Sequence, residues 1–473
     1  MGTISSAFSI MTGALEGDQQ ALNVISNNVA NANTPGYTQE VPTWQQNDSV
    51  QIGGREYGTG VSETGATSVR DRVLTERIDQ QQQLAAASGT RLTSLQTVQS
   101  LFTPDSGSTS SKAGDIGSDL TSFFGSFSSL EADPTSNALR ESVLSSATTL
   151  SADISGAANS LNAQQLSIDQ EAAGISSQVN SLTTNIAALN QQIGSTSPTG
   201  DAGTLEDQRE EDLSQLSKLI GINQITTEDN GLSVTTASGQ LLVAGSNSYQ
   251  ISNGLVDGVT HFFLGTTDVT AGLTTGGGEL GGYLTVRDQD IPSVVSSLDQ
   301  LAYGISTTVN ALNNSGSNLN GTKGTADNPN YIFNQPSAVN GAAAAMSVTM
   351  VNPSLIAAAG ANNGTGDNSN AVSMAALGNQ SIVGGQTPIN FFSTLVATLG
   401  ATVSEVQTQN TAQNASVTQL QSQNSALSGV NLDDEASSMS TMERAFQSAS
   451  QVFDILNNIM NSALNLGEQT TVS

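Results

Sequence analysis

The side chains that could carry out chemistry are few in this sequence. Of its 473 residues, one is histidine, His261, and none is cysteine. The lack of cysteine excludes disulfides, thiol catalysis and iron–sulfur ligation, and a single histidine excludes every zinc site that needs two or more His or Cys ligands. His261 could in principle act as a general base, but the adjacent Phe262, Phe263 and Leu264 favour a strand surface. We therefore expect no catalytic or metal-binding residue.

Two loop motifs have the spacing of ligand sites but not the residues that such sites need. Residues 276–281 match the G-x-G-x-x-G pattern of dinucleotide-binding loops, but Glu279 would repel a pyrophosphate, so a turn before a helix is predicted. Asn318, Asn320 and Gly321 resemble the start of a calcium loop whose glutamate at the twelfth position is missing, which favours a turn. The sequence has no H-E-x-x-H, G-x-S-x-G or P-loop motif. It predicts a protein that is not an enzyme and binds no cofactor.

The charge balance is strongly acidic. The chain has 41 acidic and 12 basic residues and a net charge of −29, which disfavours binding to nucleic acids and to anionic lipid surfaces. No apolar run approaches the length of a transmembrane helix. The first basic residue is Arg55, so the charged start of a signal peptide is missing. We expect neither membrane insertion nor a cleaved signal.

Both ends of the chain carry apolar residues in alternating steps of three and four. This 3.5-residue period is typical of a coiled-coil seam. The two seams are expected to pair, which makes one discontinuous domain from residues 1–35 and 430–473. The predicted seam consists of Ile4, Phe8, Met11, Leu15, Asp18, Leu22, Ile25 and Val29 at one end and Met439, Met442, Phe446, Ala449, Phe453, Leu456, Met460 and Ala463 at the other.

A middle domain is expected over residues 36–429. Thinner seams predict long helices in a bundle, and alternating residues with turn signals predict a β subdomain over about 222–265. The fold class is therefore mainly α with a β-containing insert: a discontinuous terminal coiled-coil domain plus a helical-bundle middle domain with a small β subdomain. The interior helices are expected over about 74–102, 175–193, 293–312 and 396–427.

Turn and capping residues mark several boundaries. Asp133-Pro134 predicts a break between helices, and residues 195–203 and 313–330 predict loops. Gly429 has the position of a helix C-terminal cap. Asn431 is expected to cap the next helix, whose positive N-terminal end suits the acidic residues Asp433, Asp434 and Glu435.

The terminal pair is not expected to be stable alone. Burying a single seam between two helices contributes less than the conformational entropy lost when both helices are ordered. We therefore expect neighbouring subunits to complete this domain. Residues 1–35 and 436–473 should be mobile in an isolated monomer and ordered in an assembly.

Residues 26–38 read SNNVANANTPGYT. This segment resembles the N-terminal signature of bacterial flagellar rod, hook and hook-associated proteins. Asn33 is expected to end the first helix, and Pro35-Gly36 suits a type II turn that leads the chain out of the seam.

Further segments narrow the resemblance to the hook-associated protein 1 family, the first hook–filament junction proteins. Residues 428–435, SGVNLDDE, resemble that family's C-terminal signature. Residues 205–221 are similar to its interior helix, and residues 120–150 and 278–288 are similar to other segments. The resemblance covers most of the chain in collinear order.

The resemblance implies a structural protein of the flagellar axis, exported through the flagellar type III apparatus and located outside the cell at the hook–filament junction. It implies contacts with other copies in an axial ring, with hook protein, with the next hook-associated protein toward the filament, and with a cytoplasmic export chaperone at about 436–466. The residues expected to serve assembly or partner binding are Ile4, Phe8, Met11, Leu15, Leu22, Ile25, Asn27, Asn28, Val29, Asn31, Asn33, Thr34, Pro35, Gly36, Tyr37, Gly429, Val430, Asn431, Leu432, Met439, Met442, Phe446, Phe453, Leu456 and Met460.

Some features stay open at this point. Members of the family often have an outer β-domain, but here only about 335–365 is available for it, which is too short for a separate domain; we expect that domain to be absent or reduced to a loop. Asp18 in the seam faces either a channel or an adjacent subunit. The alternatives in function are another axial flagellar protein, such as hook protein or the second junction protein, and a secreted adhesin or glycan-binding module with flagellar-type ends.

Overall fold

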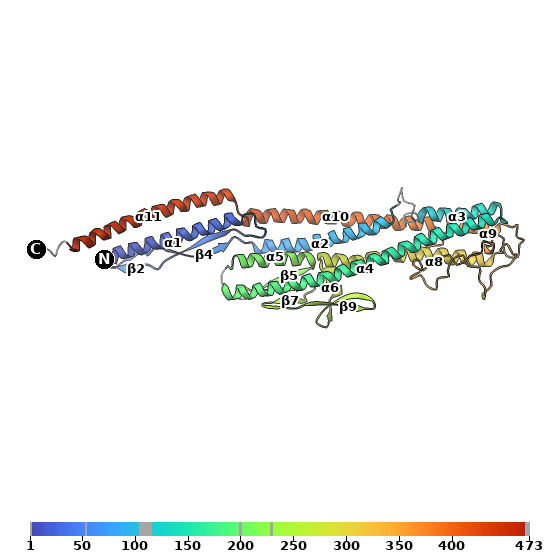
Figure 1. The fold of residues 1–473 in the computed structure, drawn as a ribbon, viewed down its shortest axis with the longest axis horizontal. Helices are drawn as coiled ribbons and strands as arrows, with labels where there is room; N and C mark the ends of the chain where they lie inside the picture. Colours follow the sequence, from blue (N-terminus) through green and yellow to red (C-terminus); the bar gives the residue numbers. More distant parts are fainter. Residues whose placement is uncertain (1, 53, 104–115, 198–200, 228–229, 469–473) are drawn as a thin grey trace. The chain divides into compact units, whose positions relative to one another are not determined.

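The computed structural model describes residues 2–52, 54–103, 116–197, 201–227 and 230–468 (Figure 1). The chain forms two compact units. The first unit comprises Met1–Gln83, Gln178–Ile251 and Asn414–Ser473, and the second comprises Leu84–Ser177 and Ser252–Gln413. Helices dominate both units, as the sequence predicts, and the strands form small antiparallel sheets.

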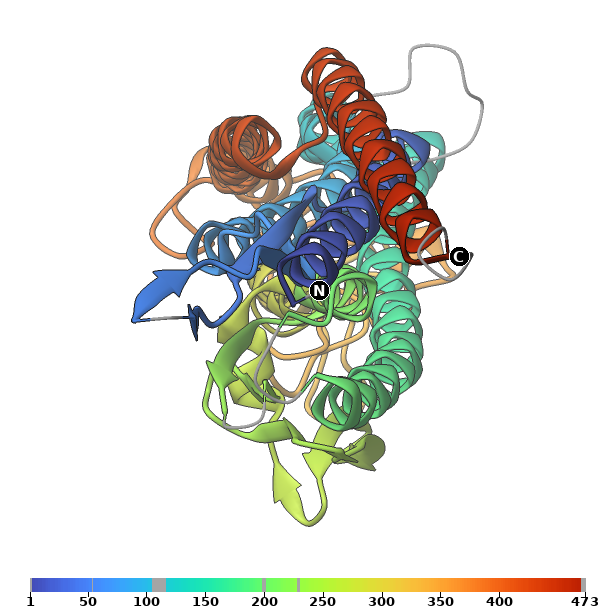
Figure 2. The same cartoon turned by 90° about the vertical axis from the view of Figure 1, so that its left-hand side faces the viewer.

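In the first unit the two ends of the chain lie side by side. Helix α1 (Gly2–Asn31) packs against α11 (Leu432–Glu468), and both views show the two helices together (Figures 1 and 2). The rings of Phe8 and Phe453 meet edge to face with centroids 5.2 Å apart. The helices run antiparallel, since Asn28 near the end of α1 contacts Glu435 near the start of α11. The predicted pairing of the two ends is confirmed by these contacts.

A β-hairpin that we did not predict covers α1. Strands β1 (Glu40–Gln46) and β4 (Val61–Ser68) pair antiparallel and pack on α1, and β2 (Val50–Ile52) pairs with β3 (Arg55–Tyr57). The Trp44 ring lies on Gly17, where a Cβ would come within 2.4 Å of a ring carbon. Only glycine leaves room for the indole there, so this position of α1 fixes where the hairpin sits.

The remainder of the first unit is a helix-on-sheet core. Helix α5 (Thr204–Leu219) follows the end of α4 (Asn137–Thr196), and the chain then forms a four-stranded meander. Gln83 of α2 (Arg72–Leu101) makes hydrogen bonds with both the N–H and the carbonyl of Ile222 at the start of the sheet. The meander strands are β5 (Ile222–Thr226), β6 (Leu232–Thr236), β7 (Leu241–Ala244) and β8 (Asn247–Ser248).

The second unit holds the larger apolar core. Helix α3 (Ile116–Ala132) buries residues at steps of three and four, the spacing of one helix face. Helix α8 (Ile291–Ser315) buries the side chains predicted for its inner face, among them Leu298, Leu301 and Ile305. The first part of α4, α9 (Ser369–Ala376), the first part of α10 (Pro388–Ser428), the second part of α2 and residues within 332–358 also contribute to this core.

A three-stranded sheet and a broken helix complete the second unit. Strands β9 (Ile251–Val256), β10 (Val259–Leu264) and β11 (Thr267–Asp268) precede α6 (Thr270–Gly276) and α7 (Gly278–Thr285). A π-helical turn, η2 (Val286–Asp290), joins α7 to α8. It places the fully buried Arg287 against Asp169, at 2.6 Å. The short 3-10 helices are η3 (Pro353–Leu355) and η4 (Leu377–Asn379).

Most of the predicted boundaries agree with the structure. α3 ends at Ala132 and α4 begins at Asn137, so the break at Asp133-Pro134 is confirmed. α6 ends at Gly276 and α7 begins at Gly278, so the turn predicted before a helix is at Gly277, which has φ 96°. Residues 318–322 form a turn closed by the Asn318 side chain. Strands are present in the predicted β subdomain of about 222–265, but its residues 228–229 and residues 198–200 of the predicted loop lie outside the described residues.

The compact units divide the chain at other positions than the expected domains do. Their boundaries fall inside α2, α4, β9 and α10 rather than near residues 35 and 430. α2 and α4 bury apolar side chains on both sides of their boundaries, and the hairpin after residue 39 packs on α1. The division into a discontinuous terminal domain of residues 1–35 and 430–473 and a middle domain therefore stays a prediction about the assembled protein.

One described helical stretch, Pro388–Asn465, is long and apolar enough to cross a membrane by length and composition alone. It consists of two helices, α10 and α11, with a break between them. A core helix passes the same test, and the first part of α10 is such a helix. It buries Phe392, Leu395, Leu399, Val403 and Val406 in the second unit.

Candidate assembly site

Asn28 is the centre of the contact between the two terminal segments. Its side chain is 1% exposed, and its amide nitrogen donates to Glu435 Oε1 at 2.9 Å and to the Glu40 carbonyl at 2.8 Å. Its amide oxygen accepts from the Glu40 N–H at 3.0 Å and from the Tyr37 hydroxyl at 2.8 Å. These contacts use both donors and both lone pairs of the amide. Asn28 therefore holds α1, the chain after it and α11 together.

Glu435 is a buried carboxylate with dedicated partners. It is 3% exposed and also accepts a hydrogen bond from Gln39 Nε2 at 2.7 Å. It lies in the first turn of α11, where the helix dipole favours a negative charge. The sequence assigned Glu435 only to this dipole. The structure adds that two amide donors from the other end of the chain reach it.

The type II turn predicted at Pro35-Gly36 is confirmed. The Tyr37 N–H donates to the Thr34 carbonyl at 3.2 Å, and Gly36 has φ +79°, as the third residue of such a turn requires. Burial, followed by the charges of Glu40, Asp207 and Glu435, raises the pKa of Tyr37 to about 12. The hydroxyl therefore stays protonated and donates to Asn28.

Helix α5 anchors the same turn from the other side. The Thr38 N–H donates to Asp207 Oδ2 at 3.1 Å, and Arg70 forms an ion pair with both Asp207 and Glu206. Burial by itself raises the pKa of Glu206, but hydrogen bonds from Asn230 and Arg72 and the charge of Arg70 outweigh it and lower that pKa. The Glu206 carboxylate therefore stays charged and keeps its ion pair with Arg70.

The segments singled out in the sequence analysis therefore meet in the first unit. Residues 26–38 contact 428–435 through Asn28, and they contact 205–221 through Thr38. Residue 39 extends this contact, since the Gln39 N–H donates to the Ser428 carbonyl at 2.9 Å. Asn431 caps α11 by accepting from the Asp433 N–H at 3.1 Å, as predicted, and Gly429 follows the end of α10 at Ser428.

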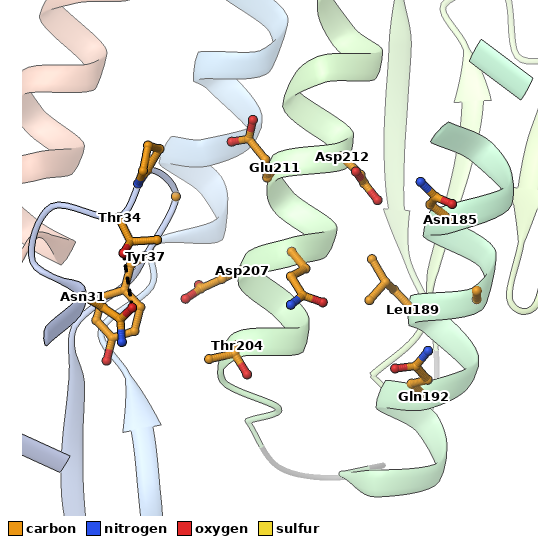
Figure 3. A pocket seen from close by; sticks show the side chains of 14 residues that line it. Asn31, Thr34, Tyr37, Asn185, Leu189, Gln192, Thr204, Asp207, Glu211 and Asp212 are labelled. Atoms are coloured by element: carbon orange, nitrogen blue, oxygen red, sulfur yellow. Dashed lines mark hydrogen bonds between the residues drawn. The ribbon is translucent and has the colours of Figure 1, made fainter. Parts of the chain in front are cut away.

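An open pocket of about 620 Å³ lies in front of the turn (Figure 3). The close-up shows Asn31 and Thr34 on one side and the side chains of α4 and α5 on the other. Its lining is made of amides, carboxylates and apolar groups, and the described lining residues include no histidine, lysine or arginine. This composition suits polar contact with another surface. The residues of α4 and α5 are Asn185, Ala188, Leu189, Gln192, Thr204, Asp207, Gln208, Glu211 and Asp212.

The predicted seam residues of α1 and α11 are only partly covered in the single chain. Ile25 is buried, whereas the others between the two helices are half-buried: Ile4, Phe8, Met11, Leu15, Leu22, Met439, Met442, Phe446, Phe453 and Leu456. Asp18 is half-buried, and burial raises its pKa. One helix pair leaves one side of its seam open.

Other predicted residues lie outside this contact. Val29 is 40% exposed, because Asn28 takes the inward position at the end of the seam, and Met460 is 38% exposed, because α11 extends beyond the start of α1. Leu432 is 51% exposed at the start of α11. The exposed residues among the others are Asn27, Asn33, Thr34, Pro35, Gly36 and Asn431. The half-buried ones are Asn31, Tyr37, Gly429 and Val430. Their roles in assembly stay predictions.

His261 lies on strand β10, as predicted, and its Nδ1 is 2.6 Å from Asp268 Oδ2. Within the part of the chain that the structure describes, no three or more His, Cys, Asp or Glu side chains are grouped so as to hold a metal ion.

Sequence reasoning missed Glu40 and Glu435 as partners of Asn28, and Gln39 as a partner of Glu435. It also missed the Trp44–Gly17 contact, which needs a strand where Pro42 interrupts the pattern. The signal available in the sequence was the pair of family-like segments, 26–38 and 428–435, at opposite ends of the chain. It indicates that the two segments meet, but not which of their atoms form the contact.

Comparison with known proteins finds relatives over nearly the whole chain. The model of the flagellar hook-associated protein FlgK helical domain matches residues 106–326, and that of the flagella basal body rod protein matches residues 9–38. The chain is 25% identical to flagellar hook-associated protein 1 of Salmonella typhimurium over 563 aligned positions, which cover 98% of this chain and all of that protein. It is 25% identical to flagellar hook-associated protein 1 of Bacillus subtilis, with 96% of each chain covered.

A solved structure has the same fold. The flagellar hook junction protein FlgK from Burkholderia pseudomallei matches with a TM-score of 0.65 at 18% identity, over 74% of this chain and all of that one. Near full-length similarity to these relatives and the two matching family models agree with one another, and the chain resembles flagellar hook-associated protein 1 over nearly its whole length.

Proposed function

We propose that this chain is a structural protein of the bacterial flagellum that forms part of the junction between hook and filament. The observation that carries the proposal is the contact of Asn28 with Glu435, which joins the two terminal segments into one antiparallel helix pair. The matching family models and the names of the relatives, which are hook-associated proteins, supply the biological setting.

Self-assembly through the terminal helices is the proposed mechanism. The seam between α1 and α11 is half-buried in one chain, and α11 exposes further large apolar residues, including Ile455 at 57% and Leu464 at 62%. Exposed apolar rows of this kind mark interaction sites. Additional copies around an axis would bury these surfaces and complete the coiled coil.

The other partners follow from the setting of the junction. We infer contacts with hook protein on one side and with the next hook-associated protein on the other, and binding of an export chaperone to about residues 436–466 before export. The chain reaches the outside of the cell through the flagellar export apparatus. The apolar face of α11 supports the chaperone proposal, because an exposed apolar helix face needs cover in the cytoplasm.

A reduced outer domain is also part of the proposal. The alignment with the Salmonella protein has 563 positions, more than the 473 residues of this chain, so that relative contains segments that this chain lacks. Residues 335–365 contain only bridges, turns and the short helix η3. The region expected for the outer domain therefore serves as a loop.

Removal of residues 436–473 tests the proposal. The truncation deletes most of α11 and leaves both compact cores with the rest of their elements. We expect cells that produce only this variant to export flagellin into the medium without attaching filaments. Intact filaments on such cells would contradict the proposed role.

A further inference from the structure

The outward face of α11 differs from the face that meets α1. Residues 444, 448, 452, 455 and 459 follow one another in steps of three and four and share a helix face. Val452 is 43%, Ile455 57% and Ile459 47% exposed. Arg444 lies at the other end of this face, and within the described residues its guanidinium group donates only to Ser440 of its own helix.

The outward face of α1 has the opposite character. Exposed residues again follow the heptad spacing, but they are small or polar and include one acidic residue, Glu16. Within the described residues Glu16 forms no ion pair. The members of this face are Ser5, Ser9, Thr12, Glu16, Gln19, Asn23 and Ser26.

The antiparallel register brings complementary residues of the two faces to the same levels. Phe8 lies opposite Phe453, and counting inward from that contact along both helices brings Glu16 level with Ala445, one residue from Arg444. The same count puts Ser9 level with Val452, and Ser5 near Ile455. Large apolar side chains thus have small partners at their own level.

Charge decides which surfaces of two copies can meet. Arg444 is the single basic residue in 1–35 and 430–473, where acidic residues are several. A contact between like-charged helix pairs is repulsive unless this cation faces an acid. On the outward face of α1, Glu16 is the acidic residue that lies nearest to the level of Arg444.

We propose that α11 of one copy packs its outward face on the outward face of α1 of a lateral neighbour, antiparallel and at the same level. Arg444 then lies beside Glu16 of the neighbour, with Val452 and Ile455 over the neighbour's serines. The contact is heterologous, so each copy offers both faces, and repetition gives a ring or a helix. This inference rests on the proposed function and adds to it which residues of neighbouring copies face each other.

Cysteine cross-linking tests the register, since the chain has no cysteine of its own. Two differently tagged full-length variants, Glu16→Cys and Arg444→Cys, are produced in one strain lacking the natural chain, and flagella are treated with a mild oxidant. A disulfide needs Cα atoms about 4.4–6.8 Å apart. We expect a mixed dimer carrying both tags, which can form only between copies.

Matched pairs make the test specific. The pair Glu16→Cys and Asp454→Cys is the control. Asp454 is exposed but lies at a different level of α11 from Arg444, so this pair should give no mixed dimer. Ser9→Cys with Val452→Cys should cross-link and serves as the second pair if the first impairs assembly. Absence of mixed dimers for both predicted pairs, or equal cross-linking of the Asp454 pair, would overturn the register.

A charge exchange gives an independent readout. Glu16→Arg or Arg444→Glu alone should weaken each lateral contact by about two- to five-fold, as expected for an exposed ion pair, and reduce the number of filaments. The double variant should restore it. If the double variant does not restore the filament number in cells whose natural chain forms functional junctions, the register is overturned but the proposed function is not. Normal filaments on cells lacking the chain would overturn the proposed function instead.

Discussion

Asn28 and Glu435, at opposite ends of the chain, are joined by a buried hydrogen bond of 2.9 Å. The amide of Asn28 is saturated, and the carboxylate of Glu435 has a second amide donor in Gln39. The bond is therefore part of a network in which removal of one member leaves several polar groups unsatisfied.

Replacement of Asn28 by alanine should destabilise the first unit by about 3 kcal/mol. The variant leaves the Glu40 backbone and the Tyr37 hydroxyl without their partner and takes one of two amide donors from the Glu435 carboxylate, and buried unsatisfied groups carry their full desolvation cost. Urea unfolding of the protein in isolated flagella measures the loss, because the terminal helices are expected to be ordered in the assembly. Asn33→Ala, an exposed asparagine in the same segment, is the control and should change stability by less than about 0.5 kcal/mol. Equal effects of the two variants would contradict the role of Asn28.

Gly36→Ala should cost about 1–2 kcal/mol because the type II turn holds this residue at φ +79°, where a Cβ is strained. Gly58→Ala is a suitable control, since an added Cβ meets nothing within 4 Å there and the glycine has no positive φ. Thermal unfolding of both variants provides the comparison. A Gly36→Ala protein as stable as the Gly58→Ala protein would show that the turn is not built as described.

Stability of the first unit should fall as pH rises from about 4 to about 8. Burial, followed by the charge of Glu210, raises the pKa of Asp79 to about 8, against hydrogen bonding from Gln224 and the charge of Lys218. The folded chain thus holds this proton more tightly than the unfolded chain, whose aspartate pKa is about 4. Above pH 4 deprotonation favours the unfolded state, and the loss is complete above pH 8.

Asp79→Asn isolates this effect, because an asparagine oxygen still accepts from Gln224. Its unfolding free energy should decline less between pH 5 and pH 9 than that of the natural chain, by at most on the order of 5 kcal/mol. Asp48→Asn, an exposed acid in the same unit, should leave the pH profile unchanged. Parallel pH profiles of the natural chain and Asp79→Asn would refute the role of Asp79.

Amides of α1 and α11 should exchange rapidly with solvent in a dilute monomer and slowly in isolated flagella. The half-buried seam gives the pair little protection until neighbours cover it. Hydrogen exchange with mass spectrometry separates these helices from α3 and α8, whose buried cores should be protected in both states. Strong protection of both terminal helices in the monomer would contradict coupled folding and assembly.

The sequence predicted the parts of the fold that local periodicity determines. The buried stripe of α8 and the break at Asp133-Pro134 follow from the spacing of apolar residues and from the geometry of proline. The type II turn follows from Pro35-Gly36. In each case neighbours along the chain suffice to specify the conformation.

Features that depend on distant contacts were not predictable in this way. Strand β1 contains Pro42 and a weak alternation, and it is stabilised by Trp44 lying on Gly17 of α1. Glu435 looked like an ordinary acidic residue of a first helical turn, and only the fold brings Asn28 and Gln39 to it. The site was predictable as two segments that meet, and its atomic partners were not.

Electron microscopy of cells lacking this chain, with the natural gene restored as the control, tests the proposed junction role most directly. We predict hooks without filaments and flagellin released into the medium, with filaments regained on complementation. Normal filaments on the cells that lack the chain would contradict the account.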